Sequence, residues 1–255
     1  MRTVIAVHTG TGNSLYLAKK IPGAEIHLIR DFLSGDYVLP DDTDRLGIAF
    51  PVYCWGLPWP VREFISKCLA GRDNTGLGYV FGLATCGAFP LYTLHDLSAA
   101  LADAGIVLSY GASFRFPDAY LPLQKKAVTD DKAAEMAEKA EAGIAEAVRD
   151  IMNEEIRIPR RGPGWRLVRA ISSAAMKPRS NESLHAMPSC TGCATCRAVC
   201  PMGNISMESG HPVFGDRCIS CFACYHMCPV NAIEYKGATG QYHGLVNTKE
   251  LESEF

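Results

Sequence analysis

Apolar and polar positions alternate in a regular way over the first 155 residues. Short apolar runs rich in Val and Ile, too short for buried helices, predict strands at 3–8, 25–29, 45–50, 78–84 and 106–110. Apolar residues at helical spacing predict helices between the strands, at 14–20, 58–69, 92–104 and 129–155. Strands that alternate with helices predict one α/β domain with a doubly wound five-stranded parallel sheet.

Three loops of this domain are expected to meet at one edge of the sheet. They follow the first, third and fourth strands and cover 8–14, 51–59 and 85–92. Ligands of open α/β sheets bind outside the carboxyl ends of the strands, where the strand order reverses. The three loops are therefore the candidate binding site.

The first loop has the composition of a phosphate cradle. Its residues are Thr9, Gly10, Thr11, Gly12, Asn13 and Ser14. Hydroxyls and successive backbone N–H groups before a helix can enclose a phosphate. The loop lacks the lysine of the nucleotide P-loop and is not G-x-G-x-x-G, so neither nucleoside triphosphates nor dinucleotides are favoured. An unliganded loop remains an alternative, and His8 before it is expected to be hydrogen-bonded.

The other two loops combine aromatic residues with glycine, as a planar ring would require. The candidate contacts are Pro51, Val52, Tyr53, Cys54, Trp55, Gly56, Thr85, Cys86, Gly87, Ala88, Phe89 and Tyr92. The stacking aromatic is undecided between Tyr53, Trp55, Phe89 and Tyr92, and Trp55 could instead be a core or interface residue. Cys54 and Cys86 are interpreted as small buried hydrophobes. Residues 113–120 could close the pocket, with Arg115 solvated or ion-paired.

Composition describes an ordinary globular protein. The chain has 255 residues, of which 48% are hydrophobic and 20% charged, and a net charge of −2 gives no case for nucleic-acid binding. No apolar run approaches the ~20 residues of a membrane span. Because no secretory signal is visible, we expect a cytoplasmic protein with Cys54, Cys68 and Cys86 as free thiols.

Charge separates a basic segment, 156–187, from its neighbours. It carries 7 Lys or Arg against 1 acidic residue, whereas residues 1–155 carry 14 against 20. Proline and glycine interrupt the segment around a short helix expected at 165–176. The basic residues around that helix are Arg160, Arg161, Arg166, Arg169, Lys177 and Arg179. We interpret the segment as a linker clamped onto the acidic domain; the alternative is a docking patch for an acidic redox partner or an anionic membrane surface.

Two cysteine runs with one spacing follow the linker. The first is Cys190, Cys193, Cys196 and Cys200 followed by Pro201; the second is Cys218, Cys221, Cys224 and Cys228 followed by Pro229. Structural zinc would use two separated pairs of ligands, and disulfides belong to oxidising compartments. Each run resembles the bacterial ferredoxin pattern C-x₂-C-x₂-C-x₃-C-P, which implies two [4Fe–4S] clusters.

The ferredoxin pattern also implies a crossed ligand set, because the fourth cysteine of each run binds the other cluster. One cluster would take Cys190, Cys193, Cys196 and Cys228. The other would take Cys218, Cys221, Cys224 and Cys200. A unit this small has little core of its own, so we expect the clusters to hold it folded.

The whole chain resembles the fused flavodoxin–ferredoxin electron-transfer proteins of anaerobic bacteria and archaea. The loop from Thr9 to Ser14 is similar to the flavodoxin phosphate loop, with Ser14 where threonine is usual. The resemblance implies FMN, a flavodoxin-like domain at 1–155, a basic linker at 156–187, a small α+β two-[4Fe–4S] ferredoxin domain at 188–236 and a tail at 237–255.

Three functions are compatible with this resemblance. The first is electron transfer between the clusters and FMN, with a ferredoxin-like donor or acceptor protein as partner. The second is an FMN-dependent reductase of a small acceptor that takes electrons from the clusters. The third is an iron–sulfur interaction module with an empty flavodoxin-like domain. No acid–base catalytic set stands out, and direction of electron flow, potentials and oligomeric state are open.

Overall fold

A five-stranded parallel sheet forms the core of the first half of the chain. The computed structural model describes residues 1–123, 126–158 and 163–246. The strands are β1 (Thr3–Val7), β2 (Glu25–Leu28), β3 (Arg45–Pro51), β4 (Tyr79–Cys86) and β5 (Tyr110–Arg115). Their order is β2-β1-β3-β4-β5 with parallel pairing throughout, which is the flavodoxin-like order. The predicted fold of this half is confirmed.

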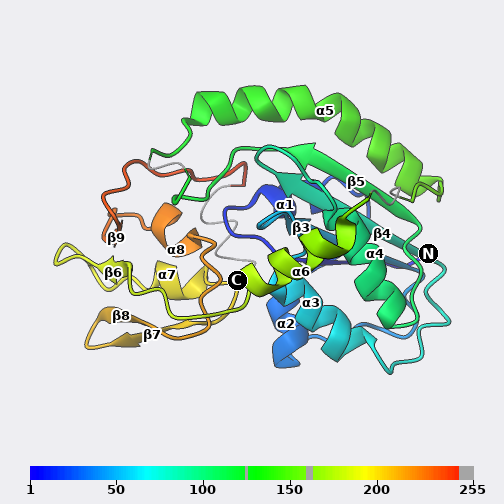
Figure 1. The fold of residues 1–255 in the computed structure, drawn as a ribbon, viewed down its shortest axis with the longest axis horizontal. Helices are drawn as coiled ribbons and strands as arrows, with labels where there is room; N and C mark the ends of the chain where they lie inside the picture. Colours follow the sequence, from blue (N-terminus) through cyan, green and yellow to red (C-terminus); the bar gives the residue numbers. More distant parts are fainter. Residues whose placement is uncertain (124–125, 159–162, 247–255) are drawn as a thin grey trace.

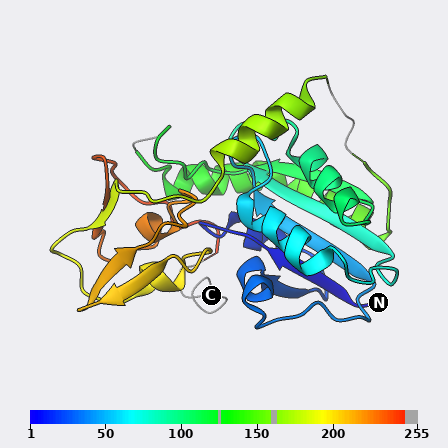
Figure 2. The same cartoon turned by 60° about the horizontal axis from the view of Figure 1, so that its bottom comes forward.

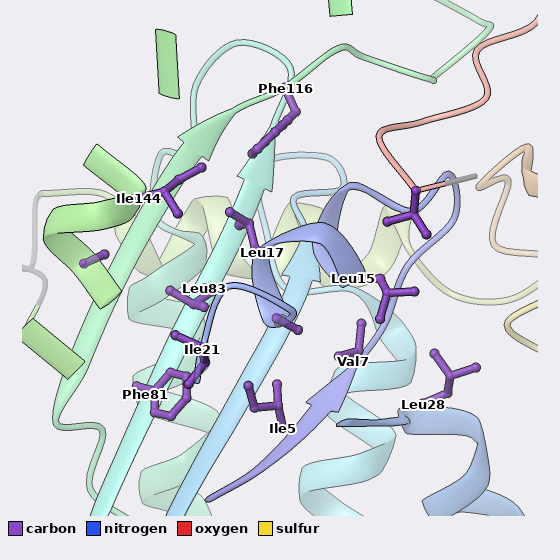
Figure 3. Packing of buried hydrophobic residues seen from close by; sticks show 14 of the residues in the cluster. Ile5, Val7, Leu15, Leu17, Ile21, Leu28, Phe81, Leu83, Phe116 and Ile144 are labelled. Carbon is purple, nitrogen blue, oxygen red and sulfur yellow. The ribbon is translucent and has the colours of Figure 1, made fainter. Parts of the chain in front are cut away.

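Helices cover both faces of the sheet (Figure 1). One face packs against α1 (Asn13–Ala18) and α5 (Asp130–Met152). The other packs against α2 (Ile29–Ser34), α3 (Trp59–Phe64) with its continuation η1 (Ile65–Leu69), and α4 (Thr93–Asp103). Figure 3 shows strand side chains meeting those of α1 and α5 on the first face. Burial on both faces explains why the inner strands β1, β3 and β4 are largely apolar.

Two elements differ from their predicted positions. The fifth strand was expected at 106–110 but begins at Tyr110. Ile106 and Leu108 are buried without being in the strand, so their apolar pattern reports core packing of the approach to β5. The helix expected at 58–69 changes to a π-helix at Ile65, where Ala70 N–H donates to Ile65 O at 2.9 Å.

The second half forms a small unit with an internal repeat. Its helices are α7 (Thr195–Ala198) and α8 (Ala223–His226), and its strands are β6 (Leu184–Ala186), β7 (Ile205–Glu208), β8 (His211–Phe214) and β9 (Ile233–Tyr235). Left-handed backbone recurs at equivalent positions of the two cysteine runs, Gly192 with Ser220 and Ala194 with Phe222. Strand β6 pairs with β9, and β7 pairs with β8.

The small unit lies at the carboxyl-terminal ends of the parallel strands (Figure 2). Helix α6 (Trp165–Ala175) connects the two halves. Before it, the chain follows the edge strand: Arg157 N–H donates to Ser109 O at 2.9 Å, and Gly111 N–H donates to Arg157 O at 3.0 Å. This arrangement brings the cysteine runs to the sheet edge where ligands of this fold bind.

Candidate functional site

A cavity of about 470 Å³ lies between the sheet edge and the small unit. Its volume is in the range of cofactor sites. All three predicted loops border it, together with residues of the linker and of the second cysteine run. The predicted residues along its wall are Thr9, Gly10, Thr11, Asn13, Ser14, Pro51, Val52, Tyr53, Cys54, Trp55, Thr85, Cys86, Gly87, Ala88 and Phe89.

The phosphate-type loop is internally braced. Thr9 Oγ1 accepts a hydrogen bond from Gly12 N–H at 3.0 Å, and Ser14 and Thr85 hydroxyls lie 3.1 Å apart. Gly12 has φ of 90°, which favours glycine. The hydroxyls and backbone groups of this loop are therefore held at one end of the cavity.

His8, which precedes the loop, is buried differently from expectation. Its Nε2 has no hydrogen-bond partner among the described residues, although the side chain is almost fully buried. Burial lowers the pKa of His8 to about 3. The imidazole is therefore neutral in the folded protein. The expectation that the side chain of His8 would be hydrogen-bonded is wrong for its Nε2 atom.

The second loop turns sharply at the cavity mouth. Tyr53 and Gly56 exchange two backbone hydrogen bonds, at 3.3 and 2.9 Å, around Cys54 and Trp55. Both central residues have positive φ, 45° and 62°, as in the turns that normally contain Asn or Gly. Trp55 is 56% exposed. Burial raises the pKa of Tyr53 well above its usual value, so its hydroxyl stays protonated.

Some predicted residues of the loops do not border the cavity. Gly12 and Gly56 are absent from its wall, and Tyr92 donates its hydroxyl hydrogen to Pro163 O at 2.8 Å. Cys54 is exposed, not buried as expected. Cys86 is buried, and this burial raises its pKa to about 11.

A third wall comes from the segment after β5. Phe116, Pro117, Asp118, Ala119 and Tyr120 border the cavity. The segment 113–120 was expected to close the pocket, and its second half does. Its Arg115 is exposed and lies outside the cavity wall.

The basic linker contacts both the acidic domain and the cavity. The guanidinium of Arg169 lies 3.1 Å from Asp96 and 3.4 Å from Asp103. Asp96 is buried, pairs also with Arg62, and accepts a hydrogen bond from Leu57 N–H at 3.1 Å. Arg160 and Arg161 lie outside the described residues.

Two further basic residues of the linker, Lys177 and Arg179, border the cavity. Arg169 thus makes the expected clamp onto the acidic domain, while these two cations lie at the candidate site.

The C-terminal segment, expected as a polar tail, reaches the phosphate-type loop. Tyr242 is fully buried and donates its hydroxyl hydrogen to Asn13 Oδ1 at 2.6 Å. Gln241 donates to Tyr225 O and Cys228 O at 2.7 and 2.8 Å. The segment has no periodicity that would have predicted this contact.

Four of the cysteines border a second, small cavity inside the small unit. These are Cys200, Cys218, Cys221 and Cys224, one set of the predicted crossed assignment. Two backbone N–H groups donate to sulfur in this set, Asn204 to Cys200 and Ser220 to Cys218, each at 3.3 Å. Hydrogen bonds of this kind stabilise thiolate ligands.

The other four cysteines also lie near one another. The pKa of Cys196 is raised to about 11, mainly by burial and in smaller part by the neighbouring thiols of Cys193, Cys228 and Cys190. Ala232 N–H donates to Cys228 Sγ at 3.1 Å. In the described part of the chain no three His, Cys, Asp or Glu side chains are grouped to hold a single metal ion. Cysteine thiolates are the usual ligands of [4Fe–4S] clusters.

Comparison with known families identifies the small unit. Residues 189–233 match the 4Fe-4S dicluster domain family. This match and the strand order of the sheet together make the chain a flavodoxin-like domain fused to a ferredoxin-type iron–sulfur domain. Comparison with curated proteins gave no significant match.

The comparison with solved structures gave matches with TM-scores below 0.5, among them the following three. The Trp repressor binding protein from Bacillus subtilis is 16% identical over 64% of this chain and 99% of its own, with a TM-score of 0.40. The two-electron reduced flavodoxin of Megasphaera elsdenii is 16% identical over 44% and 84%, with a TM-score of 0.33. The NAD(P)H:quinone oxidoreductase from Methanothermobacter marburgensis is 13% identical over 62% and 98%, with a TM-score of 0.34. The fold assignment rests on the strand order.

The described helices were also compared with the requirements of a membrane span. None of them combines the length and the apolar character needed to cross a bilayer.

Proposed function

We propose that this fusion of a flavodoxin-like and an iron–sulfur domain transfers electrons between two [4Fe–4S] clusters and FMN. The observation that supports this most is the shared cavity. Its wall combines the phosphate-type loop, the two aromatic loops and the second cysteine run. Cofactors that exchange electrons must lie close together, and the loops expected to bind the flavin border the same cavity as Cys218 and Cys221.

The residues assigned to each cofactor follow from the loops. The hydroxyls and backbone of Thr9–Ser14 would hold the FMN phosphate. Loops 51–56 and 85–89 would flank the flavin ring, with Trp55 and Phe89 as exposed aromatic surfaces at the cavity. The two groups of four cysteines would bind the clusters in the crossed arrangement.

The protein's own contribution is to position and tune these groups. When bound, FMN supplies one- and two-electron redox chemistry and each cluster supplies one-electron chemistry. Apolar walls limit the access of water to the cofactors. Backbone N–H groups that donate hydrogen bonds to sulfur influence the reduction potential of a cluster. Asp118, Lys177 and Arg179, which all border the cavity, set the local charge. We place the domain limits near 1–155, 156–187 and 188–236, with a ferredoxin-like protein as partner and a cytoplasmic location.

A second candidate function is reduction of a small acceptor. It is supported by the exposed side chains of Trp55 and Phe89 at the cavity, 56% and 68% exposed. Such a reductase would show saturable turnover of one defined acceptor. An electron carrier would instead exchange electrons with many one-electron proteins.

The assignment of the phosphate-type loop is tested by the double substitution Thr11→Val and Ser14→Ala. Both side chains are buried at the cavity, and removal of their hydroxyls removes hydrogen bonds to a charged group worth about 1.5–3 kcal/mol each. We expect the dissociation constant of FMN to rise at least about tenfold. Flavin fluorescence titration of anaerobically purified protein measures this.

The control is Thr75→Val, in the loop before β4 and away from the cavity. Iron content should be the same in all three proteins, because among the described residues none of the hydrogen bonds to the sulfurs of the cysteine runs comes from a substituted residue. Unchanged FMN affinity in the double variant would remove the loop from the proposal. A wild-type protein that binds iron but no flavin would favour the interaction module.

A further inference from the structure

The segment Cys218–Cys221 separates the two cavities. Cys218, Ile219 and Cys221 border both the large cavity and the small cysteine cavity, and Ser220 borders the large one. Within the described residues, the first cysteine run contributes nothing to the wall of the large cavity. Only one of the two cysteine groups is therefore adjacent to the candidate flavin site.

The separating segment is thin and closely packed. A Cβ atom on Gly10 of the phosphate-type loop would lie 3.4 Å from Cys221 O and 3.5 Å from Cys221 Cβ. Cys218 and Arg179 exchange two backbone hydrogen bonds, each of 3.0 Å, and Asn181 donates to Ser220 Oγ at 3.2 Å. Ile219 is 6% exposed. The segment Cys218–Cys221 thus forms a single layer of residues between the two cavities, and contacts with Gly10, Arg179 and Asn181 fix its position.

The other cysteine group reaches the surface at Cys193, which is exposed. Each group otherwise contains two buried cysteines, and the remaining ones, Cys190, Cys218 and Cys221, are half-buried. The thiols of Cys196 and Cys224 are close enough to influence each other. The two groups are therefore neighbours, with the outer one nearer to solvent.

Building on the proposed function, we propose an order of electron transfer. The inner cluster, held by Cys200, Cys218, Cys221 and Cys224, exchanges electrons directly with the flavin across Cys218–Cys221. The outer cluster, held by Cys190, Cys193, Cys196 and Cys228, exchanges electrons with an external one-electron carrier protein.

Each step moves one electron between neighbours. In the reducing direction the external carrier is oxidised as the outer cluster is reduced, and the outer cluster is then oxidised as the inner cluster is reduced. The inner cluster returns to its oxidised form as the flavin accepts the electron. Two such passages, with protons taken from solvent, reduce one flavin fully; the opposite direction reverses each step.

The order is tested first with substitutions that leave all cysteines in place. Ile219 and Thr191 occupy equivalent positions, each directly after the first cysteine of its run. Ile219→Ala would open the partition to water, and solvent access near a redox centre changes its potential. We expect this variant to shift the midpoint potentials of the flavin and of the inner cluster. Thr191→Ala should shift only the midpoint potential of the outer cluster.

Anaerobic spectroelectrochemistry of the holoprotein measures these potentials, and flavin fluorescence reports on the ring's surroundings independently of turnover. A flavin potential that moves with Thr191→Ala and not with Ile219→Ala would overturn the order.

A second pair of variants removes one ligand from each cluster. Cys218→Ser and Cys190→Ser are equivalent in the two runs. After rapid reduction of the flavin by light, we expect electron exchange between flavin and clusters to slow much more in Cys218→Ser than in Cys190→Ser. With a reduced viologen as external donor, cluster reduction should slow in Cys190→Ser.

These outcomes separate the two proposals. If the wild-type holoprotein contains no flavin, the proposed function itself fails. If flavin is present but Cys190→Ser slows its exchange with the clusters as much as Cys218→Ser, only the order fails.

Discussion

Individual residues at the cavity depart from ordinary backbone or burial in ways that sequence patterns do not show. Cys54 and Trp55 have positive φ in the turn that carries the exposed aromatic ring, a conformation that costs about 1–3 kcal/mol per residue. His8 is buried and neutral with Nε2 unpartnered among the described residues. Such features cluster at functional sites. Cys54 and Trp55 border the candidate flavin cavity, and His8 directly precedes Thr9 of its wall.

His8 predicts a pH dependence of stability. Its folded pKa, about 3, lies below the value of about 6.5 expected in the unfolded chain. Between these values the unfolded state binds more protons, so stability is lost as pH falls. Lowering pH from 7 to 5.5 should cost about 1 kcal/mol through this group.

The measurement is the melting temperature of wild type and His8→Gln at both pH values under anaerobic conditions. The melting temperature of His8→Gln should fall less between pH 7 and pH 5.5 than that of the wild type. Equal losses in the two proteins would show that His8 is not the titrating group.

At the scale of elements, α6 docks on the cavity loop through small residues and one ion-pair network. Gly56 faces Ser172 of α6: a Cβ on Gly56 would overlap Ser172 Oγ and lie 2.6 Å from Ser172 Cβ. Arg169 adds contacts to Asp96 and Asp103. The helix therefore depends on a glycine in the loop for its close approach.

Substitution of Gly56 tests this docking. We expect Gly56→Ala to destabilise the protein by about 1–3 kcal/mol, because overpacking forces the helix away. Ser172→Gly removes the overlapping atoms and should recover part of the loss when combined with Gly56→Ala. Thermal unfolding of both single variants and the double variant gives the coupling energy. Purely additive losses would contradict direct contact between these positions.

At the scale of the whole molecule, the C-terminal segment connects the iron–sulfur unit to the phosphate-type loop. Gln241 binds the carbonyls of Tyr225 and Cys228, and Tyr242 binds Asn13. Gly244 packs directly on the backbone of Thr11. A change in this segment should therefore affect flavin binding from outside the loops that form the cavity.

Two glycines of this segment make a matched test. Gly244 and Gly240 both have φ of 74°, but a Cβ on Gly244 would overlap Thr11 O, whereas on Gly240 it would meet Ala127 Cβ at an ordinary 3.6 Å. Gly244→Ala should weaken FMN binding about tenfold, since overpacking costs roughly 1–3 kcal/mol. Fluorescence titration measures the affinity, and iron content checks the clusters.

Gly240→Ala carries the same backbone strain without the overlap and should bind FMN as wild type does. Equal weakening in both variants would attribute the effect to strain alone. Loss of iron in Gly244→Ala would show that the substitution disrupts the iron–sulfur unit instead of the loop.

The sequence by itself determined the class of each half. Continuous apolar runs alternating with helical periodicity specify a parallel sheet because both of its faces must be covered, and strand order confirms it. The cysteine spacing identifies the iron–sulfur unit because ligand geometry is local, and the family match agrees. The candidate loops could be located because they directly follow the predicted strands in the sequence. Gly12, Gly56 and Tyr92 of these loops nevertheless lie outside the cavity wall.

Only the tertiary structure decided how the halves meet. The start of β5 at Tyr110 depends on pairing with β4, which the apolar pattern of 106–110 does not encode. The contacts of Tyr242 with Asn13 and of the second cysteine run with the cavity join residues far apart in the chain. Such long-range packing leaves no periodic trace in a sequence, because a local pattern identifies a segment and not the distant segment on which it packs.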